Sequence, residues 1–205
     1  MRILNTIGGA FAPEGKQILA ELGEVDYKVL SQAELVKIIG GYDAALIGLG
    51  LRFDREVLEK AGDLKVIAAA TTGLDHVDIG FAAERGIEVL SLRGEDEFLN
   101  TISGTAELAL GLMISLVRRI PFAFDSVKRY EWNREAFQGI TLRGRTLGIV
   151  GLGRLGSMMA RYGEALGMKI IFSDPHKDNY PPQYKKVSFA ELLKESDVVS
   201  VHVHL

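Results

Sequence analysis

The glycine-rich segment Gly151–Gly156, with the sequence Gly-Leu-Gly-Arg-Leu-Gly, restricts the fold of this chain more than any other feature. The apolar run at 146–150 predicts a buried strand directly before it. Residues 154–166 predict a helix that Gly167 closes, and the apolar run at 169–173 predicts a second strand. A strand, a glycine-rich turn, a helix and a second strand make a βαβ unit with parallel strands. The segment therefore indicates an α/β fold.

Each glycine of this motif has a separate physical role. Gly151 allows a tight turn, Gly153 lets the backbone approach a diphosphate, and Gly156 lets the helix pack closely on the strand. The backbone amides at the start of the helix, where Arg154 and Leu155 lie, have no partners within the helix and attract anions. We therefore predict a dinucleotide-binding turn, with a purely structural glycine turn as the alternative interpretation.

Asp174 follows the second strand and lies 18 residues beyond Gly156. An acidic residue at about this spacing binds the ribose hydroxyls of NAD. Its charge would repel the 2′-phosphate of NADP, and no arginine occurs in the segment Pro175–Lys177 that follows it. The sequence thus favours NAD as the cofactor, while Lys177 leaves NADP open.

The first ninety residues alternate short apolar runs with amphipathic stretches. These predict strands at 3–4, 27–30, 44–47, 64–70 and 87–90, and helices at 13–22, 31–40, 54–61 and 77–85. Strands that alternate with helices at this spacing pair in parallel through crossover helices. The polar residues at 94–97 interrupt the alternation, and we place a domain boundary near residue 100.

A long apolar helix is predicted at 105–119, with Pro121 ending it. Its apolar core, Leu108–Val117, has ten residues, about half of the roughly 20 that a membrane span needs. Because the helix is apolar nearly all round, we expect it to be buried against a domain or another subunit. Trp132 is expected to pack within the chain or across a dimer contact, and we predict a homodimer through residues 105–132.

Ser31–Glu34 and Ser188–Glu191 both have capping-box spacing, and the latter predicts a helix that ends near Glu195. The apolar run at 197–203 predicts the third strand of this region. A dinucleotide-binding sheet is built from two βαβαβ halves, with the cofactor across the crevice between them. We expect one half of such a sheet in this chain.

The charge and composition argue against several function classes. The net charge is −3 over 205 residues, with both signs spread along the chain, so we expect no nucleic-acid partner and no membrane partner. The sequence has no cysteine, which removes disulfides, thiolate zinc sites and a cysteine nucleophile. The N-terminus has too short an apolar run for a signal peptide, and we expect a cytoplasmic protein.

The four histidines do not have the spacing of a metal site. His202 and His204 are two residues apart and would face the same side of a strand, but we predict no metal. His202 is either a catalytic base or a wall residue of the adenosine site. We favour the wall, because a base must reach the nicotinamide end and no orienting carboxylate is evident.

Four motifs resemble the D-isomer-specific 2-hydroxyacid dehydrogenases, the family of phosphoglycerate dehydrogenase, glyoxylate reductase and D-lactate dehydrogenase. They are Leu142–Gly156, Thr72–Asp78, Thr105–Ala109 and Val201–Val203. The resemblance covers essentially the whole chain. It implies a flavodoxin-like parallel-sheet substrate domain at 1–100, and at 101–205 the interdomain helix with the first half of a Rossmann doubly wound NAD-binding domain.

The resemblance also implies which residues bind the cofactor. Thr105 matches a residue that lines the nicotinamide pocket. Arg154 and Leu155 match the pair whose backbone contacts the diphosphate. His202 and Val203 match a segment that borders the adenine ribose. These join the three glycines and the acidic residue of the motif as the predicted NAD site.

For the substrate, the resemblance implies that backbone amides of Thr72 and Gly73 bind the carboxylate of the acid, with help from the turn near Leu49. Leu49 stands about where phosphoglycerate dehydrogenases have a substrate-binding arginine, which makes a phosphorylated substrate less favoured. His204 departs from the proline common in the family at that place.

The family transfers a hydride between NAD(H) and a small 2-hydroxy or 2-oxo acid, using an arginine, a glutamate and a histidine. No position of this chain matches any of the three, and the family's C-terminal segment that packs on the substrate domain has no match either. We therefore expect no catalytic residue here and little activity from the chain alone. The alternatives are a non-catalytic NAD-binding or dimerising protein, and completion by a second chain.

Overall fold

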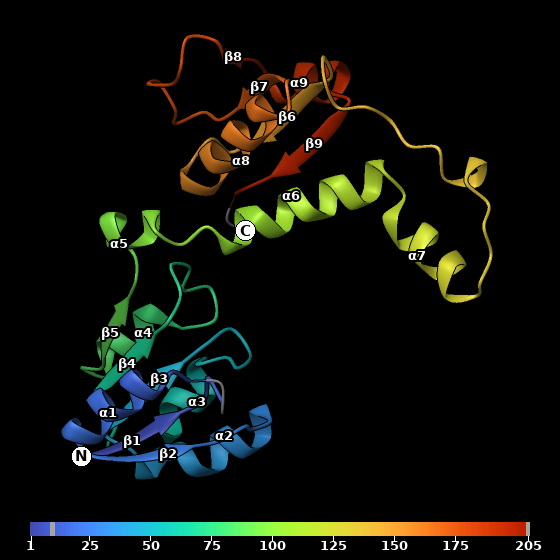
Figure 1. Ribbon diagram of the computed structural model, residues 1–205. Helices are drawn as coiled ribbons and strands as arrows, with labels where there is room; N and C mark the ends of the chain where they lie inside the picture. The colour runs from blue at the N-terminus through green and yellow to red at the C-terminus, as the bar shows by residue number, and fades with distance from the viewer. Residues whose placement is uncertain (9–10, 204–205) are drawn as a thin grey trace. The chain divides into compact units, whose positions relative to one another are not determined.

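The structure is a computed structural model that describes residues 1–8 and 11–203 (Figure 1). It divides into two compact units, Met1–Leu99 (unit 1) and Asn100–Leu205 (unit 2). Each unit has its own parallel sheet and its own hydrophobic core. The predicted parallel pairing of the strands is confirmed in both units. His204 lies outside the described residues.

Unit 1 contains a five-stranded sheet with the order β2-β1-β3-β4-β5, in which every neighbouring pair is parallel. This is the flavodoxin-like strand order. The elements are β1 (Arg2–Asn5), α1 (Pro13–Leu22), β2 (Glu24–Tyr27), α2 (Gln32–Ile38), η1 (Ile39–Gly41), β3 (Ala44–Ile47), α3 (Arg55–Lys60), β4 (Val66–Ala69), α4 (Ile79–Glu84), β5 (Glu88–Ser91) and α5 (Asp96–Asn100).

Side-chain caps determine where three helices of unit 1 begin. Ser31 and Glu34 form a capping box at the start of α2, in which each side chain accepts from the other residue's backbone amide. Asp54 caps α3 and Asp78 caps α4, each by accepting a backbone N–H three residues later. The buried faces of these helices meet one face of the sheet, where Leu4, Ala45 and Ile67 belong to the same core.

The strand predicted at 27–30 is wrong by about three residues. The strand ends at Tyr27, and Val29 lies beyond it with 88% of its surface exposed. Glu24, Val25 and Asp26 pair with β1 instead, although two of them are acidic. As the outermost strand of its sheet, β2 tolerates polar residues that a central strand would not.

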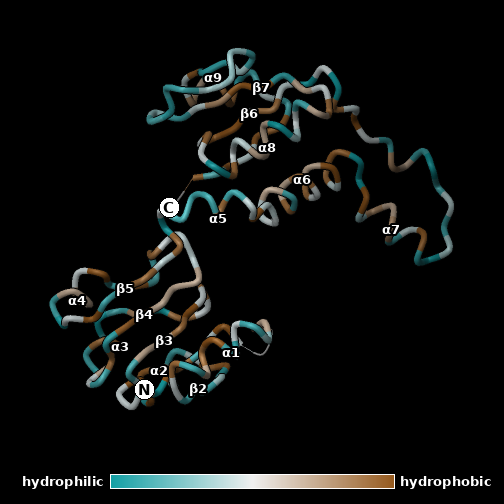
Figure 2. Tube along the Cα trace, turned by 60° about the vertical axis from the view of Figure 1, so that its left-hand side comes forward, coloured by the Kyte–Doolittle hydropathy of each residue, from teal (hydrophilic) through white to brown (hydrophobic). Residues whose placement is uncertain are grey.

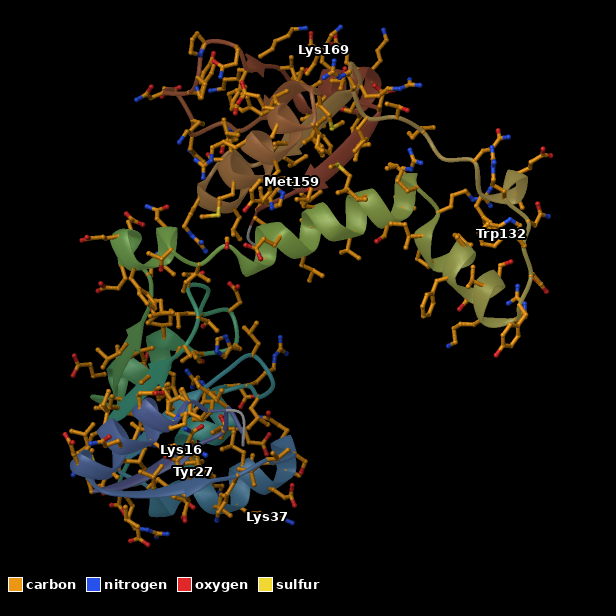
Figure 3. The ribbon with its side chains drawn as sticks, viewed as in Figure 1. Lys16, Tyr27, Lys37, Trp132, Met159 and Lys169 are labelled. Carbon is orange, nitrogen blue, oxygen red and sulfur yellow. The ribbon has the colours of Figure 1, made fainter. Side chains whose placement is uncertain are left out.

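Unit 2 contains a four-stranded parallel sheet with the order β8-β7-β6-β9. The elements are α6 (Gly104–Val117), α7 (Ile120–Lys128), η2 (Glu135–Phe137), β6 (Thr146–Val150), α8 (Arg154–Ala165), β7 (Lys169–Ser173), β8 (Lys185–Lys186), α9 (Phe189–Glu195) and β9 (Val198–Val201). Met113 of α6 and Met159 of α8 share a core with Leu147 of β6, and Figure 3 labels Met159 in this region. Leu192 of α9 lies against Gly148, on the opposite face of β6.

The strand predicted as the third of this region is in fact the fourth. The two-residue strand β8 precedes it and pairs with β7 on one side of the sheet, while β9 pairs with β6 on the other side. The strand order therefore reverses between β6 and β9. In open parallel sheets, ligands bind in the crevice outside the carboxyl ends of the strands at such a reversal.

One face of the long helix is buried within unit 2, and the opposite face is exposed in the single chain. Ala106, Met113 and Val117 are buried, but Leu108, Leu112 and Leu116 are 62%, 62% and 73% exposed. Figure 2 shows hydrophobic residues in brown along α6 and at the start of α7. Within the described residues of unit 2, no element covers the apolar residues on this face of α6.

The long helix ends two residues before the predicted end at Arg119, and Pro121 is not the residue that stops it. Helix α6 ends at Val117, and Arg119 adopts the left-handed conformation with a φ of 56°. Pro121 then lies in the first turn of α7. Proline is tolerated there because a backbone N–H in the first turn has no acceptor within the helix.

By length and composition alone, the stretch Asp96–Val117 is apolar enough to cross a membrane. In the structure, however, it consists of two helices separated by residues 101–103. Its longer helix, α6, has 14 residues, or about 21 Å of length. The hydrocarbon core of a bilayer is about 30 Å thick. Helix α6 alone is therefore shorter than the hydrocarbon core of a bilayer.

Candidate dinucleotide-binding site

The predicted glycine turn lies between β6 and α8, at the carboxyl end of β6 (Figure 1). Gly151 has a φ of +86°, a conformation that side chains other than glycine rarely adopt. A Cβ atom at Gly151 would lie 2.8 Å from the carbonyl oxygen of His202 and 2.7 Å from Cγ1 of Val203. The turn thus packs directly against the residues that follow β9, at the reversal of strand order.

The other two glycines fit a diphosphate in different ways. A Cβ atom at Gly156 would overlap the carbonyl oxygen of Gly151, so α8 begins in close contact with the turn. A Cβ atom at Gly153 would meet nothing within 4 Å, and the backbone there is open. An anion can therefore approach the backbone at the start of α8. These observations support a diphosphate at this turn over a purely structural role.

Asp174 follows β7 and is held against the same turn. The backbone N–H of Leu152 donates to its Oδ2 at 2.8 Å, and the N–H of His176 donates to its Oδ1 at 2.9 Å. An ionised carboxylate has about four acceptor positions, so lone pairs remain for two sugar hydroxyls. The carboxylate is thus fixed in place before any sugar binds.

His202 lies at the end of β9 and is half-buried. Its backbone N–H donates to the carbonyl oxygen of Val150 at 2.8 Å, and its Nε2 lies 2.8 Å from Oγ of Ser200. Burial lowers the pKa of the imidazole below its ordinary value of 6.5, which favours the neutral ring. Within the described residues, no carboxylate is hydrogen-bonded to this ring. The arrangement supports a wall residue better than a general base.

Arg154 and Leu155 are the first two residues of α8, as the motif predicts. The guanidinium of Arg154 donates from Nη1 to the carbonyl oxygen of Ile102 at 2.7 Å. Thr105 is the second residue of α6, a helix that packs on α8. No pattern in the sequence indicates the contact between Arg154 and Ile102, which are far apart in the chain.

The predicted substrate residues of unit 1 lie together at one edge of its sheet. Leu49 follows β3 and is 75% exposed, while Thr72 and Gly73 follow the neighbouring parallel strand β4. The hydroxyl of Thr71 donates to the carbonyl oxygen of Gly73 at 2.7 Å and shapes the second of these loops.

A small cavity of about 170 Å³ lies beside these loops and is lined by Arg52, Asp54, Asp75, His76, Val77 and Asp78. Two of its carboxylates, those of Asp54 and Asp78, already cap helices. Burial lowers the pKa of His76, whose Nε2 is buried without a hydrogen-bond partner. In the part of the chain that the structure describes, no three His, Cys, Asp or Glu side chains are grouped for a metal ion.

Two protein-family models match this chain. The D-isomer specific 2-hydroxyacid dehydrogenase, catalytic domain matches residues 3–140, and the D-isomer specific 2-hydroxyacid dehydrogenase, NAD binding domain matches residues 110–205. The second match supports NAD as the cofactor, as predicted.

Curated relatives agree with these matches. The D-3-phosphoglycerate dehydrogenase of Methanocaldococcus jannaschii is 38% identical over 194 residues, which cover 92% of this chain and 36% of that protein. The hydroxypyruvate reductase of Thermotoga maritima is 38% identical over 182 residues, which cover 89% of this chain and 58% of that protein. This chain thus spans about a third to somewhat over half of the length of these relatives.

Solved structures give the same fold. The TT0316 protein from Thermus thermophilus has a TM-score of 0.88 and is 34% identical, over 100% of this chain and 65% of its own. The D-lactate dehydrogenase from Aquifex aeolicus, complexed with NAD and lactic acid, has a TM-score of 0.80 and is 26% identical, over 99% of this chain and 60% of its own. The predicted fold class is confirmed.

Proposed function

The chain belongs to the D-isomer-specific 2-hydroxyacid dehydrogenase family, and from this premise we propose that the whole protein transfers a hydride between NAD(H) and a small 2-hydroxy or 2-oxo acid. The observation that carries the proposal is the glycine turn with Asp174 fixed beside it. NAD, when bound, accepts or donates the hydride. The residues of this chain bind and orient it.

The cofactor site that we propose lies along the carboxyl ends of β7, β6 and β9. The open backbone at Gly153, with the amides of Arg154 and Leu155, would bind the diphosphate through the positive end of α8. Asp174 would accept hydrogen bonds from the ribose hydroxyls of the adenosine. We further propose that Gly151 and Gly156 give the backbone of this site its conformation. Its walls are then formed by Thr105, His202 and Val203.

Unit 1 supplies the substrate loops in this proposal, within a substrate domain at 1–100. Backbone amides of Thr72 and Gly73 would bind the carboxylate of the acid, and Leu49 would contact its substituent. Leu49 carries no charge and is exposed, which favours an acid without a phosphate group. One relative is named a hydroxypyruvate reductase, and hydroxypyruvate is an acid of this kind.

We propose that this chain by itself does not catalyse the reaction, because none of its residues matches the family's arginine, glutamate or histidine. The test is the absorbance of NADH after addition of glyoxylate, hydroxypyruvate or pyruvate to the 205-residue chain. The proposal expects no oxidation of NADH. It also expects measurable NAD binding by calorimetry, whereas a chain with an unrelated role would release no heat with NAD.

We also propose a homodimer through residues 105–132. Leu108, Leu112 and Leu116 recur every four residues and form one exposed stripe along α6, and Trp132 is 86% exposed in the segment after α7. Four-residue spacing is typical of a helix face that packs on another helix. A monomer rarely leaves so continuous an apolar surface in water.

The dimer proposal is tested by Leu112→Glu. This side chain is 62% exposed in the single chain, so a charge there does not disturb the core. Light scattering after size-exclusion chromatography is expected to give a dimer for the wild type and a monomer for the variant. A wild-type monomer, or a dimer that Leu112→Glu leaves intact, would contradict the proposal.

A further inference from the structure

The short strand β8 consists of two lysines whose side chains have different surroundings. The side chain of Lys185 is 63% exposed, and its ammonium forms an ion pair with Glu195 at 3.1 Å. Lysines are common on edge strands, where their charge hinders pairing with other chains. Lys186 differs from this pattern, because only 32% of its side chain is exposed. Protection of a sheet edge therefore accounts for Lys185 but not for Lys186.

The ammonium of Lys186 reaches from β8 to the segment that follows β7. Its Nζ donates to the carbonyl oxygen of Lys177 at 2.8 Å and to Oδ1 of Asp178 at 3.4 Å. The side chain of Asp178 is 94% exposed, so water screens this ion pair. A hydrogen bond from a charged donor is stronger than one between neutral groups. The principal contact of Lys186 is therefore with the backbone at Lys177.

This contact closes a loop of the chain around Asp174. Lys186 pairs with Phe172 in the sheet, and the N–H of Val187 donates to the carbonyl oxygen of Phe172 at 2.9 Å. Phe172 lies two residues before Asp174, and Lys177 lies three residues after it. The backbone on both sides of Asp174 is thus tied to β8, through the sheet pairing on one side and through the ammonium of Lys186 on the other.

The turn inside this loop holds the carboxylate of Asp174. The backbone N–H of His176 donates to its Oδ1 at 2.9 Å, and this bond requires that residues 174–176 stay in their turn. A carboxylate that is already fixed binds a sugar more strongly, because less freedom of movement is lost on binding. Lys186 anchors Lys177, the next residue of the chain, and so stabilises the turn that orients Asp174.

We propose that Lys186 is a positioning residue for the ribose, which anchors the turn 174–177 so that Asp174 accepts a hydrogen bond from the 2′-hydroxyl of the adenosine. The proposal rests on the NAD site proposed above. Lys186 acts in this role through the backbone of Lys177 and the carboxylate of Asp174. Loss of its ammonium is therefore expected to weaken recognition of the hydroxyl and to leave binding of the diphosphate intact.

Calorimetric titration of the 205-residue chain with ADP and with 2′-deoxy-ADP tests this role. The two nucleotides differ only in the 2′-hydroxyl, so the ratio of their affinities isolates its bond to Asp174. We expect the wild type to prefer ADP by at least about fivefold. Lys186→Met keeps the aliphatic stem but removes the ammonium, and it is expected to lower this preference to about twofold or less by weakening ADP alone. Lys185→Met, the matched control at the neighbouring position, is expected to keep the wild-type preference.

The outcomes separate this proposal from the NAD site itself. If Lys186→Met keeps the preference for ADP, the positioning role is overturned and the NAD site stands. Equal weakening of both nucleotides in this variant, or loss of the preference in Lys185→Met as well, also overturns the role, because either result indicates a general effect on the fold.

The wild type tests the premise of the proposal. Equal affinity for the two nucleotides overturns the ribose contact of Asp174 and with it the role of Lys186, and no binding of either nucleotide overturns the whole NAD site. Melting temperatures report whether each variant folds. Lys186→Gln, whose shorter side chain also lacks the charge, replaces Lys186→Met with the same expectations if the latter does not fold.

Discussion

Replacing Gly151 by alanine is expected to damage the binding turn in two ways that the structure separates. The φ of +86° disfavours any residue with a Cβ atom, at a cost of about 1–2 kcal/mol. The new methyl group would also lie 2.8 Å from the carbonyl oxygen of His202, 3.1 Å from its carbonyl carbon and 2.7 Å from Cγ1 of Val203. Because two of these atoms belong to the backbone, rotation of a side chain does not relieve the overlap.

The steric part adds about 1–3 kcal/mol, as inserted methyl groups do in packed interiors. Gly151→Ala is therefore expected to lower the free energy of unfolding by about 2–5 kcal/mol. Movement of the turn away from the residues after β9 would also displace the amides that face the diphosphate. We expect the affinity for NAD to fall at least about tenfold, which corresponds to about 1.4 kcal/mol.

Gly86→Ala is the matched control. Gly86 has a φ of +70°, but a Cβ atom there would meet nothing within 4 Å. The control therefore carries the backbone cost alone, about 1–2 kcal/mol, and leaves NAD binding unchanged. Urea denaturation and calorimetric titration with NAD measure both quantities. If Gly151→Ala costs no more stability than Gly86→Ala and binds NAD as the wild type does, the reasoning about this turn is refuted.

Three further predictions concern the cap of a helix, a half-buried imidazole and the acidic residue of the site. Ser188→Ala removes the capping box of α9 and is expected to lower the free energy of unfolding by about 1 kcal/mol. Urea denaturation measures this loss, together with that of the equivalent change Ser31→Ala at α2. If both variants are as stable as the wild type, the capping argument is contradicted. Burial lowers the pKa of His202 below 6.5, so the unfolded chain binds more protons and stability falls as the pH decreases from about 7 to about 5. His202→Gln is expected to make the melting temperature depend less on pH over this range. The rest of the decrease is expected to come from His76, because burial also lowers the pKa of its imidazole. A melting profile that His202→Gln leaves unchanged would contradict the role of His202. Asp174→Ala leaves two backbone amides without their acceptor and is expected to lower the free energy of unfolding by about 1–3 kcal/mol. It is also expected to weaken NAD binding at least about tenfold. If the variant binds NAD with wild-type affinity in calorimetry, the role of Asp174 is refuted.

Elements with strong local signals could be predicted from the sequence. The strands at 146–150 and 169–173 and the start of α8 occur where the apolar runs and glycines place them. Both capping boxes form, because their hydrogen bonds lie within four residues of the chain and need no tertiary partner.

Elements that depend on distant partners could not be predicted. The strand β8 has two lysines and no apolar run, and it exists because β7 offers it a free edge. The break between α6 and α7 depends on the left-handed Arg119, a residue type that gives no sign of this conformation. The exposure of the leucine stripe on α6 likewise depends on which elements pack against this helix. Because the helix is apolar on all faces, its sequence does not indicate which face is exposed.

The candidate site shows the same division. The glycines and Asp174 were identifiable because their spacing follows from the geometry of one βαβ unit. The hydrogen bond from Leu152 to Asp174 and the contact of Arg154 with Ile102 join residues 22 and 52 positions apart. Neither leaves a pattern in the sequence. The contact of Gly151 with the residues after β9 could not be predicted from the sequence either, because it depends on the reversal of strand order.

The central claim is that the turn after β6 binds a diphosphate while Asp174 binds the adjoining ribose. Amide chemical-shift mapping of the chain during a titration with ADP-ribose tests it most directly. The account predicts saturable shifts concentrated at residues 151–156, at 174–176 and at 202–203, and their loss in Asp174→Ala. Shifts confined to other parts of the chain, or a titration that this substitution leaves unaltered, would contradict it.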